Sequence, residues 1–360
     1  MARTWFFSPC LLLAALALPG AAGCDGSEDP GAPGEPMLIH AAPPASPDGS
    51  GAGDGPGLAL AISRVRLGRH DPAGASDEDA WETIGFDLDG VVTLAEHHAT
   101  CAASPGATFE ATLRDGHAGR DNSFGKNIVP MLDALAGSAE ERTNDDIRNG
   151  LYTTLFSLDE LGDEPEYGTV PAHVYEGAPV GPEPPAFDGH DVWSPTFESA
   201  PAGDPPPMRA PLHESYLADD GGGGTWVGRS EGVVTFRAAM SREPARDKVA
   251  TLSVHRPIIA VHLDEERAAG TGTLTGYLRP GELHAEIRRV VSLHHPGACH
   301  GQGLDGLERQ IEKAADILED GSIDPEAPCD AISFGVAFEV IRVHLGPRAP
   351  PAPPPADPCH

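Results

Sequence analysis

Lysine is almost missing from this chain, and positive charge is scarce overall. Lys126, Lys248 and Lys313 are the three lysines among 24 basic residues, which face 55 acidic residues and leave a formal net charge of −31. Nucleic acids and anionic lipid head groups attract clustered basic side chains, so we expect neither as a partner. Such acidity is compatible with cation binding, although acidic surfaces most often serve only solubility.

Two further patterns are missing. None of the six cysteines stands in a C-x-x-C pair, which argues against a zinc ribbon or a thioredoxin-type redox motif. The apolar run from Leu11 to Leu18 is too short to cross a bilayer as a helix. A short apolar run near the N-terminus is instead typical of an export signal.

The segment Ala21-Ala22-Gly23-Cys24 resembles the lipobox that closes the signal peptide of bacterial lipoproteins. Arg3 supplies the positive end of such a signal, and the apolar run supplies its core. The resemblance implies that residues 1–23 are cleaved and that Cys24 carries palmitate and related acyl chains. We therefore expect a protein of the cell envelope that is exported from the cytoplasm and held on a membrane by its lipid anchor.

Composition divides the remainder into three parts. Residues 24–57 are rich in glycine and proline and predict a flexible linker, and residues 347–360 predict a proline-rich tail. Residues 58–346 between them predict one globular domain. Within it, the stretch 176–224 is again rich in proline and glycine, and it either divides two domains or forms one long surface excursion. We favour the excursion, because the predicted strands on either side look alike.

Most of the regular structure is predicted to be β. Ile332, Phe334, Val336, Phe338 and Val340 alternate with smaller residues, and the alternation then slips, which indicates a bulge near Val340 or burial of both faces. Helices are expected at 130–136 and 304–319. The other predicted strands are 58–67, 81–88, 107–113, 151–158, 225–239, 249–263 and 272–292. The predicted fold is mainly β, an antiparallel β-sandwich with one or two short helices.

Four cysteines remain for disulfide formation if Cys24 is lipidated: Cys101, Cys299, Cys329 and Cys359. Four cysteines allow three pairings, and disulfides persist in exported proteins. We favour Cys299 with Cys329 because these two bracket the predicted helix at 304–319.

The motif Phe86-Asp87-Leu88-Asp89-Gly90 resembles the nucleophile motif of haloacid dehalogenase-like phosphatases. That resemblance implies Asp87 as the nucleophile, Asp89 as acid and base, and Mg²⁺ as the cofactor. The other residues of the family's pattern have counterparts in the right order at Thr235, Lys248 and Asp264-Glu265. However, the polar residues within 81–86 do not suit the buried parallel strand of that family.

A second acidic motif runs from Arg114 to Gly125 and is dense in Asp, Asn and Gly. Flexible oxygen-rich loops of this kind favour calcium, although such residues also cap ordinary turns. If strands 81–88 and 107–113 form a hairpin, the two motifs converge. The predicted calcium ligands are then Asp87, Asp89, Asp115, Asp121 and Asn122. The alternative is compensation of these carboxylates by Arg114 and Arg120.

Taken as a set, the FDLDG motif, the DGxxGRDNSFG motif and the closing CDAISFGVAFE resemble uncharacterised exported lipoproteins of myxobacterial type. That resemblance supports lipidation and implies no substrate. We interpret the chain as a lipid-anchored envelope protein that binds or scaffolds, with calcium as a stabilising ion and a protein or glycan as partner. The alternative is an exported Mg²⁺-dependent phosphohydrolase that uses Asp87 and Asp89.

Overall fold

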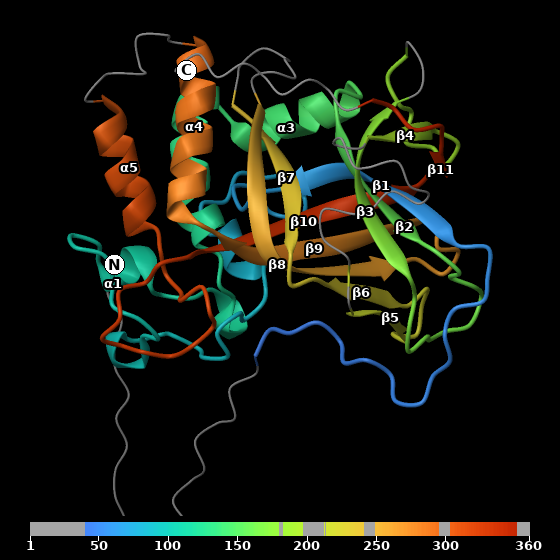
Figure 1. Cartoon of the computed structure of the whole chain (residues 1–360), viewed down its shortest axis with the longest axis horizontal. Coiled ribbons are helices and arrows are strands. Elements are labelled where there is room, and N and C mark those ends of the chain that lie inside the picture. Colours follow the sequence, from blue (N-terminus) through green and yellow to red (C-terminus); the bar gives the residue numbers. More distant parts are fainter. Residues whose placement is uncertain are drawn as a thin grey trace, which may run out of the picture. The chain divides into compact units, whose positions relative to one another are not determined.

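Eleven strands in the described part of the chain join into one continuous sheet (Figure 1). The computed structural model describes residues 40–179, 183–196, 212, 214–240, 249–294 and 303–350. The strands are β1 (Leu58–Arg66), β2 (Thr153–Leu158), β3 (Ala172–Pro179), β4 (Val192–Thr196), β5 (Glu214–Ala218), β6 (Thr225–Arg229), β7 (Val233–Ala239), β8 (Val249–Leu263), β9 (Ala269–Leu278), β10 (Ile332–Arg342) and β11 (His344–Leu345).

The strand order is β11-β4-β3-β2-β1-β10-β9-β8-β6-β5, and β7 also pairs with β8. Every pairing between these strands is antiparallel except that of β4 with β11. The prediction of a mainly β, antiparallel fold is therefore confirmed. The hydrogen bonds link all the strands into a single sheet, whose two halves face each other.

The sheet curls around one apolar core. The ring of Phe156 on β2 lies 5.7 Å from that of Trp226 on β6 and 5.5 Å from that of Phe338 on β10, although β2 and β6 are far apart in strand order. Tyr167 and Leu217 exchange two backbone hydrogen bonds, of 2.9 and 3.0 Å, which attach β5 to the loop between β2 and β3. Burial of these rings stabilises the fold.

A bulge lies near Val340, but it does not cause the slip in the alternation of β10, because β10 pairs with β9 without a register shift from Ile332 to Ile341. Ile62 pairs with Val340 and Arg64 pairs with Glu339, so Ser63 on the neighbouring strand β1 is the extra residue of a bulge. In addition, β10 is buried on both faces from Ile332 to Phe338. The bulge thus lies opposite Val340, on the partner strand.

Helices contribute more than the sequence predicted. The helices are α1 (Phe109–Thr112), α2 (Val129–Ala136), α3 (Ala139–Arg148), α4 (Pro280–His294) and α5 (Gly303–Lys313), with short turns η1 (Ala80–Thr83), η2 (Glu96–His98) and η3 (His117–Gly119) and a π-helical segment η4 (Phe124–Ile128). The predicted helices at 130–136 and 304–319 correspond to α2 and α5. Helix α5 ends at Lys313, and Ile317 pairs instead with Ala331 next to β10.

Three of the predicted strands are wrong in whole or in part. Residues 81–88 form η1 and a loop, and residues 107–113 contain α1. The stretch 272–292 is a strand only as far as Leu278 and then becomes α4, because Leu283, Ile287 and Val290 follow the period of a helix and are buried. The segment 225–239 divides into β6 and β7, and the predicted excursion 176–224 holds the end of β3 together with β4 and β5.

Helix α3 is largely polar because its side chains bond the ends of strands. Asn144 accepts a hydrogen bond from the backbone N–H of Val65 (2.7 Å) and donates one to the Val65 carbonyl (2.8 Å). Glu140 accepts from the N–H of Leu67 at 2.7 Å. These side chains take the hydrogen bonds that a neighbouring strand would otherwise form with the end of β1. Because the residues are polar, they give the sequence of α3 no hydrophobic periodicity.

The fold begins earlier than the predicted boundary at residue 58. Residues 40–57, hereafter the strap, lie along the domain. Ala41 is buried, and the N–H groups of Gly53 and Gly55 donate to the carbonyls of Thr169 (2.9 Å) and Glu160 (2.8 Å). The linker prediction is thus wrong for residues 40–57. At the other end, Ala349 of the predicted tail donates to the Pro195 carbonyl at 3.1 Å.

Several predictions fall on residues outside the described ranges. They include the signal peptide, Cys24, Cys299 and Cys359. Among the residues that are described, none of the helices combines the length and the apolar character needed to cross a membrane.

Candidate metal centre

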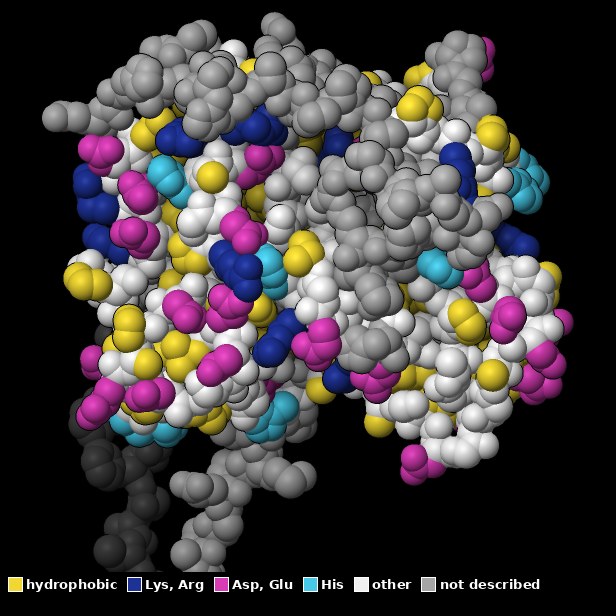
Figure 2. Space-filling view, viewed as in Figure 1, with side chains coloured by type: hydrophobic (Ala, Val, Ile, Leu, Met, Phe, Trp, Pro, Cys, Tyr) yellow, Lys and Arg dark blue, Asp and Glu magenta, His cyan; other side chains and the backbone are white. Residues whose placement is uncertain are grey.

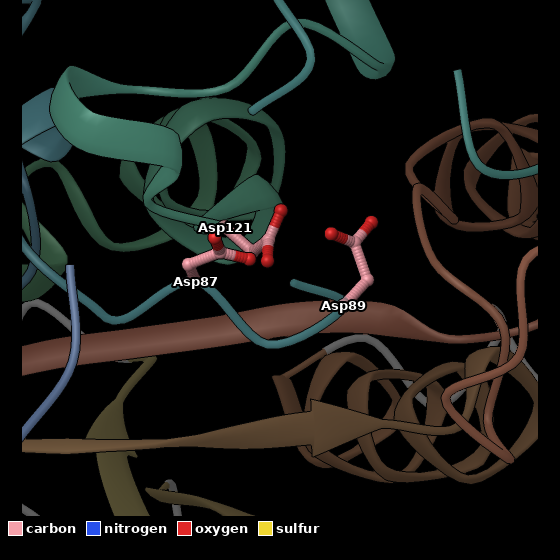
Figure 3. Close-up of side chains that lie close together, drawn as sticks. All are labelled: Asp87, Asp89 and Asp121. Atoms are coloured by element: carbon pink, nitrogen blue, oxygen red, sulfur yellow. The ribbon is translucent and has the colours of Figure 1, made fainter. Parts of the chain in front are cut away.

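Asp87, Asp89 and Asp121 converge at one point of the structure (Figure 3). One carboxylate oxygen of each lies within 4.8 Å of the corresponding oxygens of the other two. The predicted convergence of the two acidic motifs is therefore confirmed for these residues. It arises between two loops, because the predicted hairpin of 81–88 with 107–113 does not form.

The loop that carries Asp87 and Asp89 is fixed by its alternating side chains. Phe86 packs against a small cluster on β5, β6 and β8 that consists of Tyr216, Ala218, Val227 and Ala260. Leu88 packs against Tyr277, Ile317 and Ala331. With Phe86 and Leu88 on the sheet, the intervening Asp87 and the following Asp89 are left to meet Asp121 (Figure 3).

Backbone hydrogen bonds hold the second loop against the first. The N–H of Asp121 donates to the Phe86 carbonyl at 3.0 Å, and the N–H of Leu88 donates to Oδ2 of Asp121 at 2.6 Å. Asp121 is 2% exposed. A buried carboxylate is therefore placed beside Asp87 by the backbone rather than by its own flexible side chain.

Asp87 and Asp89 also have partners of their own. Oδ1 of Asp87 accepts from the N–H of Gly90 at 2.7 Å, and Oδ2 contacts Nδ1 of His40. Oδ1 of Asp89 accepts from the N–H of Val91 at 2.9 Å, and Oδ2 accepts from the Thr100 hydroxyl at 2.8 Å. These contacts fix the orientation of both carboxylates.

Two more carboxylates surround this group of three. Asp115 is buried and accepts from the N–H of Thr93 at 2.5 Å. Asp316 accepts from the N–H and the hydroxyl of Ser333 at 2.8 and 2.5 Å. The five residues Asp87, Asp89, Asp115, Asp121 and Asp316 are called the carboxylate cluster below.

Asn122 does not belong to the cluster in the way that was predicted. Its Oδ1 accepts from the N–H groups of Gly125 (2.9 Å) and Gly335 (3.1 Å). Both interactions anchor the loop to η4 and β10. We therefore assign Asn122 to positioning the loop that carries Asp121, because its only good ligand atom is already occupied.

Burial dominates the electrostatics of the cluster. Burial raises the pKa of Asp121 well above its ordinary value, and repulsion by Asp89, Asp115 and Asp316 adds to this. The same causes raise the pKa of Asp115 to about 8, and burial raises that of Asp316 to about 7. The pKa of Asp89 is also raised, first by burial. Several of these groups therefore keep protons near neutral pH unless a cation compensates them.

The predicted arginine compensation is not what the described residues show. Arg114 pairs with Glu82 at 3.5 Å and Glu110 at 3.9 Å, and Arg120 donates to the His117 carbonyl at 2.7 Å. Lys126 lies near the cluster, but its ammonium donates to the Arg114 carbonyl at 3.0 Å, and burial lowers its pKa to about 8. Arg114, Arg120 and Lys126 are thus bonded to other groups, and the basic side chain that contacts the cluster is His40, at Asp87.

A disulfide secures the outer side of the cluster, and it is not the predicted one. Cys329 is bonded to Cys101, with a Cα–Cα distance of 5.2 Å, which excludes the predicted Cys299–Cys329 pair. The neighbouring Thr100 bonds Asp89, and the N–H of Cys329 donates to the Ala102 carbonyl at 2.9 Å. The position of Cys299 and Cys329 on either side of a helix therefore did not predict the pairing, because the disulfide joins two loops that are far apart in the sequence.

Asp316 is the one member of the cluster that the sequence analysis missed. It lies between α5 and β10, and the Asp316 N–H donates to the Ala331 carbonyl at 3.0 Å. Acidic residues do follow it in the sequence, at Glu319, Asp320 and Asp324, but the sequence analysis did not single out this stretch. Its place follows from the disulfide and from the pairing of Ile317 with Ala331, neither of which a local pattern reveals.

Comparisons of this chain with protein-family models, with curated proteins and with solved structures found no match. The chemistry of the site therefore has to be judged from its donors. Clustered carboxylate oxygens suit hard cations such as Ca²⁺ and Mg²⁺, and without Cys or His ligands they suit Zn²⁺ less well.

The geometry needed by the phosphohydrolase alternative is not present. That family requires Asp87 at the carboxyl end of a parallel strand, whereas Asp87 lies in a loop beside an antiparallel sheet. Thr235 lies on β7, and Asp264 accepts from the N–H groups of Ala268 (2.7 Å) and Ala269 (3.1 Å) in the turn between β8 and β9. Asp264 therefore serves a turn.

Proposed function

We propose that this chain is a lipid-anchored binding or scaffolding protein of the bacterial cell envelope, stabilised by a calcium ion on Asp87, Asp89 and Asp121. The observation that carries the ion is the convergence of these three carboxylate oxygens within 4.8 Å. Carboxylates this close repel each other unless protons or a cation compensate them. Calcium fits best because it takes many oxygen ligands in flexible geometry.

A structural role for the ion is favoured because its ligands come from two different loops. Asp87 and Asp89 belong to the loop after η1, and Asp121 belongs to the loop before η4. The ion would hold these two loops together on the sheet. Each of the three side chains also accepts a backbone N–H, which suits a rigid structural site.

Location in the envelope is supported by different features. The lipobox-like segment ends at Cys24, and the Cys101–Cys329 disulfide suits an oxidising compartment. Acidic and basic side chains are intermixed on the face drawn in Figure 2, without one large basic patch among the coloured residues. Such a surface suits a protein or glycan partner better than nucleic acid.

Calcium is expected to raise the melting temperature of the full chain by an amount that grows with its concentration. At a hundred times the dissociation constant, the added stability is about 2.7 kcal/mol. Asp121→Asn should abolish the rise, because it removes the most buried ligand charge. Differential scanning calorimetry in EDTA and in calcium series measures both.

Asp163→Asn is the matched control, because Asp163 is exposed and lies outside the cluster. It removes one negative charge and should leave the calcium response intact. Equal responses of the Asp121 and Asp163 variants would show that calcium acts only on the general surface charge. A larger shift with Mg²⁺ than with Ca²⁺ would reassign the ion.

Lipidation is tested separately from the ion. Intact mass of the protein extracted from the envelope should correspond to a chain that starts at Cys24 and carries acyl groups. Cys24→Ala should leave the precursor unprocessed and without lipid. A mature N-terminus elsewhere, or a mass without lipid, would refute the anchor and leave the calcium site unaffected.

A further inference from the structure

The first residues of the strap cover the carboxylate cluster. Nδ1 of His40 contacts Oδ2 of Asp87, and the Asp87 side chain is 2% exposed beneath it. The N–H of Ala41 donates to the Ala118 carbonyl at 2.8 Å, and the Ala41 carbonyl accepts from the N–H of Asp87 at 2.8 Å. The strap thus contacts both loops of the cluster and closes one approach to Asp87.

The outer half of the strap, residues 40–49, has few other attachments. Most of residues 42–49 are exposed, and their contact with the sheet is the Tyr216 hydroxyl, which donates to the Pro44 carbonyl at 2.5 Å. Gly49 has a φ of +79°, which marks a turn that favours glycine.

The strap is fixed beyond this turn. Besides the hydrogen bonds of Gly53 and Gly55 given above, a Cβ on either glycine would lie within 2.4 Å of backbone atoms of residues 160–162. This close packing leaves the inner half no room to move. The strap therefore has a fixed inner half and a lightly held outer half, with Gly49 between them.

We propose that residues 40–49 act as a latch over the cation site, and that cation binding and latch closure exclude each other. This inference rests on the proposed calcium site. A cation that takes Oδ2 of Asp87 as a ligand needs the direction that the His40 imidazole occupies. Opening at Gly49 moves His40 and Ala41 away while residues 50–57 stay in place.

Hydrogen exchange of the full chain, followed by mass spectrometry with and without CaCl₂, tests the latch. Within residues 40–49, calcium should speed exchange of the Ala41 N–H, which donates to the Ala118 carbonyl, by about two- to tenfold, the effect of losing one net hydrogen bond. Exchange in residues 50–57 should not change. Faster exchange confined to the outer half supports the latch.

Variants separate the latch from the ligands. His40→Ala removes the contact with Asp87, and Tyr216→Phe removes the bond to Pro44 without touching a carboxylate. Both should speed exchange in 40–49 without calcium and tighten calcium binding about two- to tenfold. Ser50→Ala is the control, because Ser50 bonds Glu166 on the fixed side of Gly49 and should change neither quantity.

The outcomes distinguish the two proposals. If calcium raises the melting temperature but exchange in 40–49 stays the same or slows, the latch is refuted and the calcium site stands. If calcium changes neither the melting temperature nor exchange, both are refuted. Unchanged calcium affinity in both His40→Ala and Tyr216→Phe would also overturn the latch.

Discussion

The free energy of unfolding of the cation-free protein is expected to fall as the pH rises from about 4 to about 8. The cause is the carboxylate cluster, since Asp115 and Asp316 have pKa values of about 8 and about 7 against an ordinary value of 3.8. Between the ordinary and the raised values, the folded state retains protons that the unfolded state has released. Stability that depends on these bound protons is lost as the pH rises through this interval.

Between pH 6.5 and 8, the contribution of the carboxylate cluster to the pH dependence is separated from those of Asp146 and Lys126. Asp146, in α3, has a pKa raised to about 6 by burial, so its contribution ends near that pH. Lys126 acts in the opposite direction only above pH 8, where its lowered pKa begins to favour the folded state. One pKa unit corresponds to 1.36 kcal/mol, so a loss of about 2–3 kcal/mol is expected over this interval from Asp115 and Asp316 together. The raised pKa of Asp121 acts in the same direction.

Urea unfolding in EDTA at several pH values measures this loss. Asp115→Asn should reduce it, because the amide has no proton to retain, while Asp163→Asn should not. Saturating calcium should reduce the loss as well, because a cation favours the ionised carboxylates and binds more tightly as the pH rises. Stability that is constant or increases between pH 6.5 and 8 would contradict the electrostatic description of the cluster.

Removal of the disulfide is expected to have an effect of similar size. Cys101 and Cys329 are 228 residues apart, so their bond closes a very long loop. The chain-entropy description gives about 5 kcal/mol for such a loop, and measured losses of native disulfides are about 2–5 kcal/mol. The double variant Cys101→Ala/Cys329→Ala should therefore lose roughly 3–5 kcal/mol in urea unfolding.

The variant Cys299→Ala discriminates between the observed and the predicted pairing. It should keep the full stability of the parent chain, because Cys329 is bonded to Cys101. If Cys299→Ala loses as much stability as the double variant, the Cys299–Cys329 pair is the correct one. Calcium affinity should fall in the double variant, since Thr100 beside Cys101 orients Asp89.

Local patterns were sufficient for part of the fold and of the site. The alternation in β10 and the apolar stripe of α5 have the period of their element, and both were predicted. In α4, Leu283, Ile287 and Val290 carry the helical period, but the adjacent Val290-Val291 and the preceding strand β9 favoured a strand reading. Helix α3 has no apolar periodicity from which it could be predicted, because its Glu140 and Asn144 form hydrogen bonds with backbone groups of other segments.

The sequence predicted that Asp87, Asp89 and Asp121 lie together, but it predicted the wrong structural cause of their convergence. Dense Asp residues marked Asp87, Asp89 and Asp121, although they meet through loops rather than through the expected hairpin. The contributions of Asp316 and Cys101 depend on contacts across more than 190 residues. Such contacts depend on how the sheet curls. They produce no local pattern in the sequence from which they could be predicted.

The docking of the strap on the cluster also determines how the fold bears mechanical load. If Cys24 is held on a membrane, the 16 residues from Cys24 to His40 reach at most about 58 Å. Tension along this segment would act first on His40 and Ala41. It would break their contacts with Asp87 and Ala118 before it loads any strand. If the proposed anchor is present, tension on it is therefore expected to reach the carboxylate cluster before the strands of the described sheet.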